Sequence, residues 1–192
     1  MEFRVACVVE GHGDREAAPI LVRRIVDRAD SSVRAHILHP IRIPRSRLLK
    51  PGELERAVQL AALKLEGSGP VFVLLDADDD CPAQLGPQLL HRAAQACSHV
   101  PLSVVLAKRE FEAWFLASAE SLRGYKGLPS DLGPPSDPEA IRDAKGWLGD
   151  RRAEQRYIET LDQPHLARTF DLDLAHRSVV RLLNRPRRAS ES

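Results

Sequence analysis

The sequence has few cysteines, and they are widely separated. Cys7, Cys81 and Cys97 are the three cysteines in 192 residues, and no two of them form a Cys-x-x-Cys pair. Scattered cysteines in odd number argue against a disulfide framework, and the lack of a cysteine–histidine cluster argues against a zinc site. The sequence therefore favours reduced thiols, which agrees with a cytoplasmic protein.

The chain also lacks long apolar runs and a surplus of one charge. No window reaches the roughly 18 consecutive apolar residues of a transmembrane helix, so we expect no membrane association. No basic stretch followed by an apolar stretch opens the chain, so we expect no signal peptide and a cytoplasmic location. Lys and Arg number 28 against 27 Asp and Glu, a net charge of +1. This balance excludes a globally basic nucleic-acid-binding protein but allows a local basic patch.

Enough apolar residues are present for a core of ordinary size, since 43% of the chain is hydrophobic. Strands are predicted over residues 3–9, 33–43, 70–75 and 101–106, with helices between them over 14–29, 53–65 and 85–96. This alternation is typical of a parallel sheet with helices on both faces. We therefore predict an α/β fold, Rossmann-like, with a parallel sheet of about four strands.

The pattern changes after residue 107 to helices and loops. Helices are predicted over residues 110–119, 141–147, 153–161, 164–170 and 173–183. We therefore divide the chain into an α/β core over residues 1–120 and a helical C-terminal extension over residues 121–192. Because the extension is small, we expect it to pack on the core and to end in a frayed basic tail.

Acidic residues follow two predicted strands at the point where each strand ends. Glu10 follows the first strand, and the third strand leads into Asp76, Asp78, Asp79 and Asp80. Like charges this close repel one another, and a divalent cation would offset the repulsion. Alternate residues of an extended chain point the same way, so Asp76, Asp78 and Asp80 could reach one ion, and oxygen ligands suit Mg²⁺, Mn²⁺ or Ca²⁺. The alternative is that these acids are ordinary turn and helix-capping residues.

Two glycines and a capping residue come directly after Glu10. Gly11 and Gly13 let the backbone pass close to another group, which we interpret as a phosphate or the surroundings of the ion. Asp14 is interpreted as the N-cap of the following helix. A Glu at the end of a buried strand is not a requirement of a turn, so Glu10 strengthens the metal hypothesis.

The spacing of the Asp run tests three other interpretations. An EF-hand would need Gly and Glu at the sixth and twelfth positions, where this chain has Cys81 and Pro87. A phosphatase of the haloacid dehalogenase type would need Thr in place of Asp80. A metal-dependent nucleotidyl or glycosyl transferase, which also uses Asp-x-Asp after a strand, stays open, although it gives Glu10 no task.

These motifs resemble the Toprim domain, the metal-binding fold of topoisomerases, primases and the overcoming-lysogenization-defect nucleases. The likeness rests on Val-Val-Glu-Gly at residues 8–11 and Leu-Leu-Asp-Ala-Asp at residues 74–78. The run Lys-Arg-Glu-Phe-Glu-Ala-Trp-Phe-Leu-Ala at residues 108–117 resembles small stand-alone bacterial Toprim-like proteins of unknown function, often encoded beside ATPases in defence-type gene clusters. The likeness covers roughly residues 3–120. The helical part is similar to the same group more loosely, at Lys145, Gln163 and Ser178.

The resemblance implies a Mg²⁺-dependent phosphodiester hydrolase, with Mn²⁺ as an alternative ion. Asp76 and Asp78 would hold the metal with help from Asp80, and Glu10 would hold a second metal or act as general acid or base. The implied protein is a nuclease or nuclease subunit in phage or plasmid defence, with nucleic acid and an ATPase as partners, and it could form a homodimer. The rival is a catalytically silent Toprim-like subunit that binds nucleic acid or the ATPase.

Two further residues of the 108–117 run belong to the implied site. Glu112 would be an additional metal ligand, and Lys108 would stabilise negative charge on the phosphate in the transition state. The alternatives are that Glu112 stabilises the start of a helix and that Lys108 is an ordinary solvated lysine.

Basic residues gather in two places, which we interpret as surfaces that follow a phosphate backbone. One is a loop and the other is one face of the last predicted helix, where arginines recur every four residues. Their members are Arg42, Arg45, Arg47 and Lys50 in the loop, and Arg177, Arg181 and Arg185 in the helix. The alternative for each patch is a solvated face or one paired with acids.

Overall fold

A parallel β-sheet forms the centre of the chain, which the computed structural model describes at residues 2–66, 69–152 and 156–175. Its strands are β1 (Glu2–Val9), β2 (Arg34–Ile37), β3 (Ile41–Arg42), β4 (Val71–Asp76) and β5 (Leu102–Ala107). The helices are α1 (Asp14–Ala29), α2 (Arg45–Leu48), α3 (Glu53–Lys64), α4 (Pro82–Ala96), α5 (Ala113–Ala117), α6 (Ala144–Asp150) and α7 (Glu159–Thr169). Short 3-10 helices occur at Ala119–Leu122, Tyr125–Gly127 and Pro138–Ala140.

The order of the strands decides which loops meet. It is β2-β1-β4-β5, with β3 also paired to β1, and the pairings between these strands are parallel. This arrangement confirms the predicted α/β fold with a parallel sheet. Because β1 and β4 are neighbours, their carboxyl ends lie together at one edge, which is where open parallel sheets bind ligands.

The strand predicted over residues 33–43 is two strands in the structure, so the sheet has five strands. The break falls at residues 38–40, where Pro40 has no N–H to donate to β1. The backbone N–H of Leu38, at the start of the break, donates to the carbonyl of Val5 at 2.9 Å. The N–H of Ile43, just after β3, donates to the carbonyl of Val9 at 2.9 Å. β2 therefore pairs with the first half of β1 and β3 with its end.

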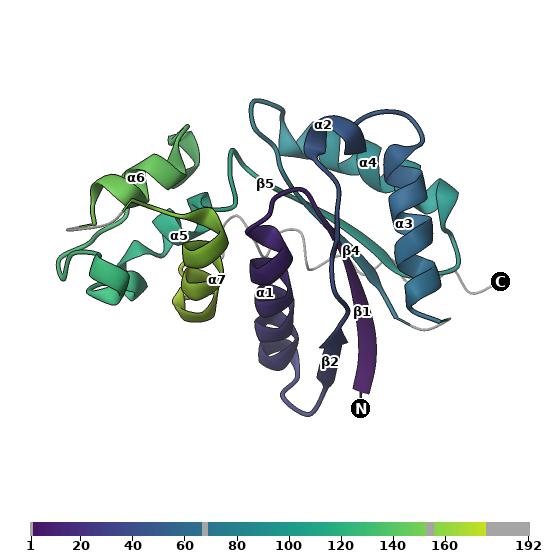
Figure 1. The fold of residues 1–192 in the computed structure, drawn as a ribbon, viewed down its shortest axis with the longest axis horizontal. Helices are drawn as coiled ribbons and strands as arrows, with labels where there is room; N and C mark the ends of the chain where they lie inside the picture. The colour runs from purple at the N-terminus through teal and green to yellow at the C-terminus, as the bar shows by residue number, and fades with distance from the viewer. Residues whose placement is uncertain (1, 67–68, 153–155, 176–192) are drawn as a thin grey trace.

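Helices cover both faces of the sheet (Figure 1). One face carries α1, α5 and α7, and the other carries α3 and α4. The side chains of β1 alternate between the two, because successive residues of a strand point to opposite faces. Val5, Cys7 and Val9 are buried on the α1 face, and Ala6 and Val8 are buried on the α3 face.

The helical part after residue 120 shares the apolar cluster of the α1 face. Leu148 of α6 and Leu166 of α7 are buried in the same cluster as Leu21 of α1. Phe170 is fully buried there, with its ring centroid 5.2 Å from that of Phe115 in α5. The helical part therefore packs against the α/β core through a continuous apolar contact.

The C-terminal helices begin and end at different residues from those predicted. Over residues 156–170, the helices predicted at 153–161 and 164–170 are replaced by the single helix α7, which continues through Pro164. Residues 153–155 of the first prediction lie outside the described part of the chain. The helix predicted over 110–119 is shortened to α5, and the helix predicted over 173–183 lies almost entirely outside the described residues. In the described ranges, no helix has the length and apolarity needed to cross a membrane.

Candidate metal and phosphate site

The acidic ends of β1 and β4 meet at one edge of the sheet. Glu10 Oε1 accepts a hydrogen bond from the backbone N–H of Asp76 at 3.0 Å. Asp76 Oδ1 accepts one from the backbone N–H of Phe111 at 2.7 Å. The parallel pairing of the two strands therefore brings together acids that are 66 residues apart in the sequence.

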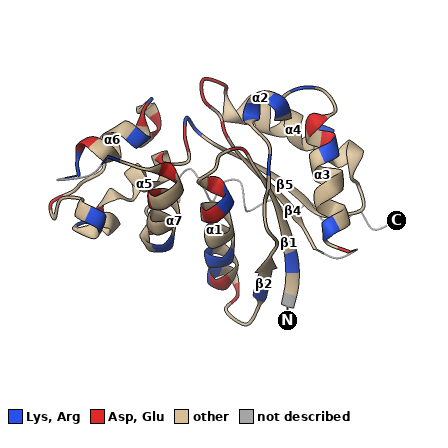
Figure 2. Cartoon of the chain, in the orientation of Figure 1, with Lys and Arg blue, Asp and Glu red and all other residues tan. Residues whose placement is uncertain are grey.

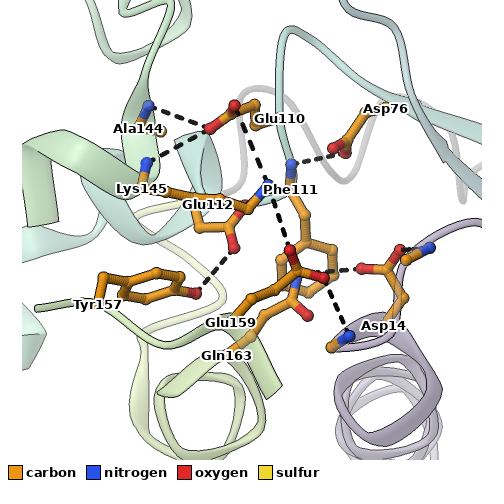
Figure 3. A network of polar contacts seen from close by, with 12 residues as sticks. Asp14, Asp76, Glu110, Phe111, Glu112, Ala144, Lys145, Tyr157, Glu159 and Gln163 are labelled. Atoms are coloured by element: carbon orange, nitrogen blue, oxygen red, sulfur yellow. Dashed lines mark hydrogen bonds and ion pairs between the residues drawn. The ribbon is translucent and has the colours of Figure 1, made fainter. Parts of the chain in front are cut away.

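A cavity of about 210 Å³ adjoins these two acids. Four carboxylates and two cationic side chains line it, from Glu10, Asp14, Asp76, Glu159, Arg45 and Lys145. The α/β core supplies one side of the wall, and helices α6 and α7 supply the other (Figure 3). The candidate site therefore lies between the core and the helical part.

Burial and repulsion raise the pKa values of the acids in this wall. Burial, with smaller contributions from the charges of Asp14 and Asp78, raises the pKa of Glu10 to about 7. Burial also raises the pKa of Asp76 well above its usual range, with the charges of Glu10 and Glu112 adding to the effect. Glu10 Oε2 is buried and has no hydrogen-bond partner in the described part of the chain. A cluster of carboxylate oxygens, one of which has no hydrogen-bond partner, fits the ligand preference of a divalent cation such as Mg²⁺.

The turn after β4 does not present its acids to the cavity as predicted. Asp78 has a φ of 51° and pairs with Arg109 in an isolated antiparallel bridge, so the chain is no longer extended there. The side chains of Asp78 and Asp80 are 58% and 53% exposed. Asp76, Asp78 and Asp80 therefore do not converge. Among the described residues no group of Asp, Glu, His and Cys side chains is arranged as a complete metal-binding set.

Arg45 holds this turn from the side of the cavity. Its Nε donates to the backbone O of Asp76 at 2.9 Å, and its Nη2 donates to that of Ala77 at 3.1 Å. The guanidinium also forms ion pairs with Asp78, at 3.3 Å, and with Asp80. Arg45, predicted to bind nucleic acid, is therefore engaged within the protein, by the turn after β4. Acidic residues gather in the loop between β4 and α4 (Figure 2).

Two of the other basic residues of the predicted loop surface are engaged within the protein. Arg42 Nη1 donates to the backbone O of Glu10 at 3.3 Å, and Arg47 forms an ion pair with Glu53 at 2.8 Å. Lys50 is exposed. The stripe predicted in the last helix lies outside the described residues and stays a prediction, at Arg177, Arg181 and Arg185.

Lys108 and Glu112 take different places from those implied. Lys108 is outside the cavity wall, with Nζ 3.3 Å from Glu139 Oε2 and a side chain that is 48% exposed. Glu112 is fully buried, and Tyr157 Oη donates to its Oε1 at 2.8 Å. Lys145 Nζ lies 3.4 Å from Glu112 Oε2. The structure therefore places Lys145 rather than Lys108 at the cavity, with Glu112 behind it.

The glycines after Glu10 make room for α7. The backbone N–H of Gly13 donates to Glu159 Oε1 at 3.0 Å. A Cβ atom at Gly13 would lie 2.1 Å from Gln163 Oε1 and 2.7 Å from Glu159 Cγ. The group that approaches this backbone, interpreted above as a phosphate or the surroundings of an ion, is a helix of the same chain.

Sequence reasoning missed the contribution of the helical part. Asp14 is the first residue of α1 rather than its N-cap, and it accepts hydrogen bonds from Gly11 N at 2.8 Å and Gln163 Nε2 at 3.0 Å. Gln163 is 149 residues from Asp14, and no spacing pattern connects positions so distant. The loose resemblance at Lys145 and Gln163 was the one available signal, and Glu159 had none.

Comparison with known proteins places the chain in a family. Neither the curated proteins nor the solved structures include one that matches the chain. A family model described as a domain of unknown function, DUF4276, matches residues 9–185, a span that contains both strand-end acids and the helices of the cavity wall. The chain therefore belongs to the DUF4276 family.

Proposed function

We propose that the protein is a Mg²⁺-dependent phosphodiester hydrolase of Toprim type, a nuclease or nuclease subunit that could use Mn²⁺ instead. The observation that supports it most is the meeting of Glu10 and Asp76 in the wall of one cavity. Two further carboxylates line the same cavity, and an unpartnered oxygen of Glu10 is buried beside them. Such a surplus of buried negative charge is costly without a cation.

Glu10 and Asp76 would hold the cation in this proposal. A divalent ion supplies activation of water and stabilisation of the leaving oxygen in phosphodiester hydrolysis. The chain itself fixes both ligands, because the Asp76 N–H orients Glu10 and the Phe111 N–H orients Asp76. Asp78 and Asp80 stay paired with Arg45 and would lie outside this pair of ligands.

The partners belong to the same proposal and rest on the resemblance. Nucleic acid is the proposed substrate, and an ATPase is the proposed partner, in defence against phages or plasmids in the bacterial cytoplasm. A homodimer is compatible with this assembly.

A second function is favoured by a specific observation. The side chains of Asp78 and Asp80, after β4, are exposed and do not line the cavity. Because Asp78 and Asp80 pair with Arg45, the chain could be a catalytically silent subunit that binds nucleic acid or the ATPase.

Cleavage assays separate the two functions. Plasmid DNA and RNA are incubated with the purified protein, alone and with the ATPase, in Mg²⁺ or Mn²⁺. Glu10→Gln and Asp76→Asn are expected to lower the cleavage rate by about 100-fold or more. Asp27→Asn, a matched change of an exposed acid near the end of α1, should cut like the wild type. Wild-type protein that cuts nothing under any of these conditions overturns the hydrolase and supports the silent subunit.

A further inference from the structure

Lys145 reaches from α6 into the acidic cavity. Its Nζ lies 3.4 Å from Glu112 Oε2, 3.9 Å from Glu159 Oε2 and 4.0 Å from Glu110 Oε1 (Figure 3). A charge-assisted N–H···O bond is about 2.7–2.9 Å long, so each of these contacts is an ion pair without a hydrogen bond. The three carboxylates therefore attract the ammonium group by charge, but its N–H groups donate no hydrogen bond to any of the described residues.

Arg45 is the other cation in the cavity wall, and its donors are already used. They are engaged by two backbone carbonyls and by the carboxylates of Asp78 and Asp80. Of the two, Lys145 is therefore the one whose donors can turn to a ligand. The surrounding carboxylates raise the pKa of Lys145 against the lowering effect of burial, so its positive charge persists.

The position of Lys145 is fixed by contacts of Glu110 and Glu112, which follow β5. Glu112 is fully buried, and Tyr157 Oη donates to it at 2.8 Å from the segment before α7. Glu110 Oε2 accepts the backbone N–H groups of Ala144 and Lys145 at 3.1 and 3.4 Å, which anchors the start of α6. These contacts tie the lysine to the loop after β5 and hence to the edge of the sheet.

We propose that Lys145 forms a phosphate-binding subsite in this cavity, with Glu112 and Tyr157 as the residues that position it. The ligand class is a phosphate ester, one of whose non-bridging oxygens accepts from the ammonium group. The proposal rests on the proposed function, because a phosphate beside four carboxylates requires a bound cation as well. It makes the helical part a component of the active site, since that part supplies a residue in contact with the substrate.

The test measures metal binding and phosphate binding separately. Titration calorimetry gives the affinity for Mn²⁺, and the broadening of the ³¹P resonance of inorganic phosphate by bound Mn²⁺ gives the affinity for phosphate. Lys145→Met is expected to weaken phosphate binding by about 10- to 100-fold. Its Mn²⁺ affinity should stay the same or rise, because a positive charge leaves the acidic cluster. Lys64→Met, a matched change of an exposed lysine in the last turn of α3, should bind both like the wild type.

The outcomes distinguish this proposal from the function on which it rests. Lys145→Met that binds Mn²⁺ and retains wild-type phosphate affinity overturns the subsite and leaves the hydrolase standing. Wild-type protein that binds no Mn²⁺ overturns both.

The positioning residues have a test of their own. Glu112→Gln and Tyr157→Phe are expected to lower phosphate affinity by about 3- to 10-fold, with little change in Mn²⁺ affinity. Measurements are made where circular dichroism shows each variant to be folded. A purely structural part for these residues would lower the melting temperature and leave phosphate affinity unchanged.

Discussion

Glu112 is a fully buried carboxyl group that faces the Lys145 ammonium and the Tyr157 hydroxyl, with Glu110 and Asp76 nearby. Burial raises its pKa from 4.5 to about 7. As the pH rises from about 4.5 to about 7, the unfolded chain releases this proton while the folded protein keeps it. The free energy of unfolding therefore falls over that window, because the folded state binds more protons. The raised pKa values of Glu10 and Asp76 act in the same direction.

We predict that Glu112→Gln loses less stability than the wild type when the pH is raised from about 5 to about 7.5. The amide cannot ionise and still offers an oxygen to Tyr157. Urea denaturation without divalent cations measures the fall in the free energy of unfolding between these two pH values. This fall should be smaller in Glu112→Gln than in the wild type by on the order of 1–3 kcal/mol. Glu120→Gln, at an exposed position in a 3-10 helix, serves as the control. Equal losses in wild type and Glu112→Gln would contradict the prediction.

The meeting of Glu10 with Asp76 was predictable, because each acid ends an apolar strand and parallel strands bring their ends to one edge. The outward turn at Asp78 was not predictable. A φ of 51° in a residue other than glycine depends on tertiary partners, here the bridge to Arg109 and the Arg45 ion pair. Side chains alternate between the two faces only within a strand, and β4 ends at Asp76.

At the scale of elements, the docking of α7 on the loop after β1 depends on a glycine. Gly13 has a φ of −65°, which alanine adopts equally well, so its importance comes from the space that its missing side chain leaves. That space is taken by Gln163 Oε1, 2.1 Å from where a Cβ would lie. The two helices α1 and α7 also lie side by side (Figure 1).

We predict that Gly13→Ala destabilises the protein by about 1–3 kcal/mol, because the added methyl group pushes α7 outward. Thermal or urea denaturation measures the loss. Gly133→Ala is the matched control, since an added Cβ there meets no atom within 4 Å. A variant at Gly13 as stable as the control would show that α7 is not held closely against this loop.

Strands and long helices of the core were predictable from apolar runs and helical periodicity. The breaks were harder to predict, because they depend on which backbone groups find partners. Pro40 splits the predicted strand over 33–43 because it cannot donate to β1. Pro164 does not split α7, whose buried residues around it are held by the rest of the fold. The same residue type therefore ends one element and is tolerated in another.

At the scale of the molecule, the core and the helical part share one apolar cluster. Trp114 of α5 is fully buried in that cluster, and Trp147 of α6 packs against it. These are the two tryptophans of the chain, so each part carries its own fluorescent probe. A continuous cluster favours cooperative unfolding.

We predict that both parts unfold in a single transition. In urea, the far-UV circular dichroism of the wild type should give one two-state transition. The fluorescence of each single-tryptophan variant, Trp114→Phe and Trp147→Phe, should do the same. Within each single-tryptophan variant, fluorescence and circular dichroism should give the same midpoint. Phe170→Ala, which empties a fully buried position, should lower the free energy of unfolding by about 3–5 kcal/mol. Fluorescence and circular dichroism should report the same loss. Separate midpoints for the two probes within one variant would show two independent folding units.

The hydrogen bond between Gly13 and Glu159 joins positions that are 146 residues apart, and it has a consequence for biosynthesis. The loop after β1 is synthesised well before α6 and α7, because it precedes them in the sequence by more than 100 residues. Folding proceeds from the N-terminal side during synthesis, so the sheet can assemble while the cavity still lacks one of its walls. The hydrolase proposed above would therefore stay inert as a nascent chain until α7 has been synthesised, and it would spare the messenger RNA and the ribosome that make it.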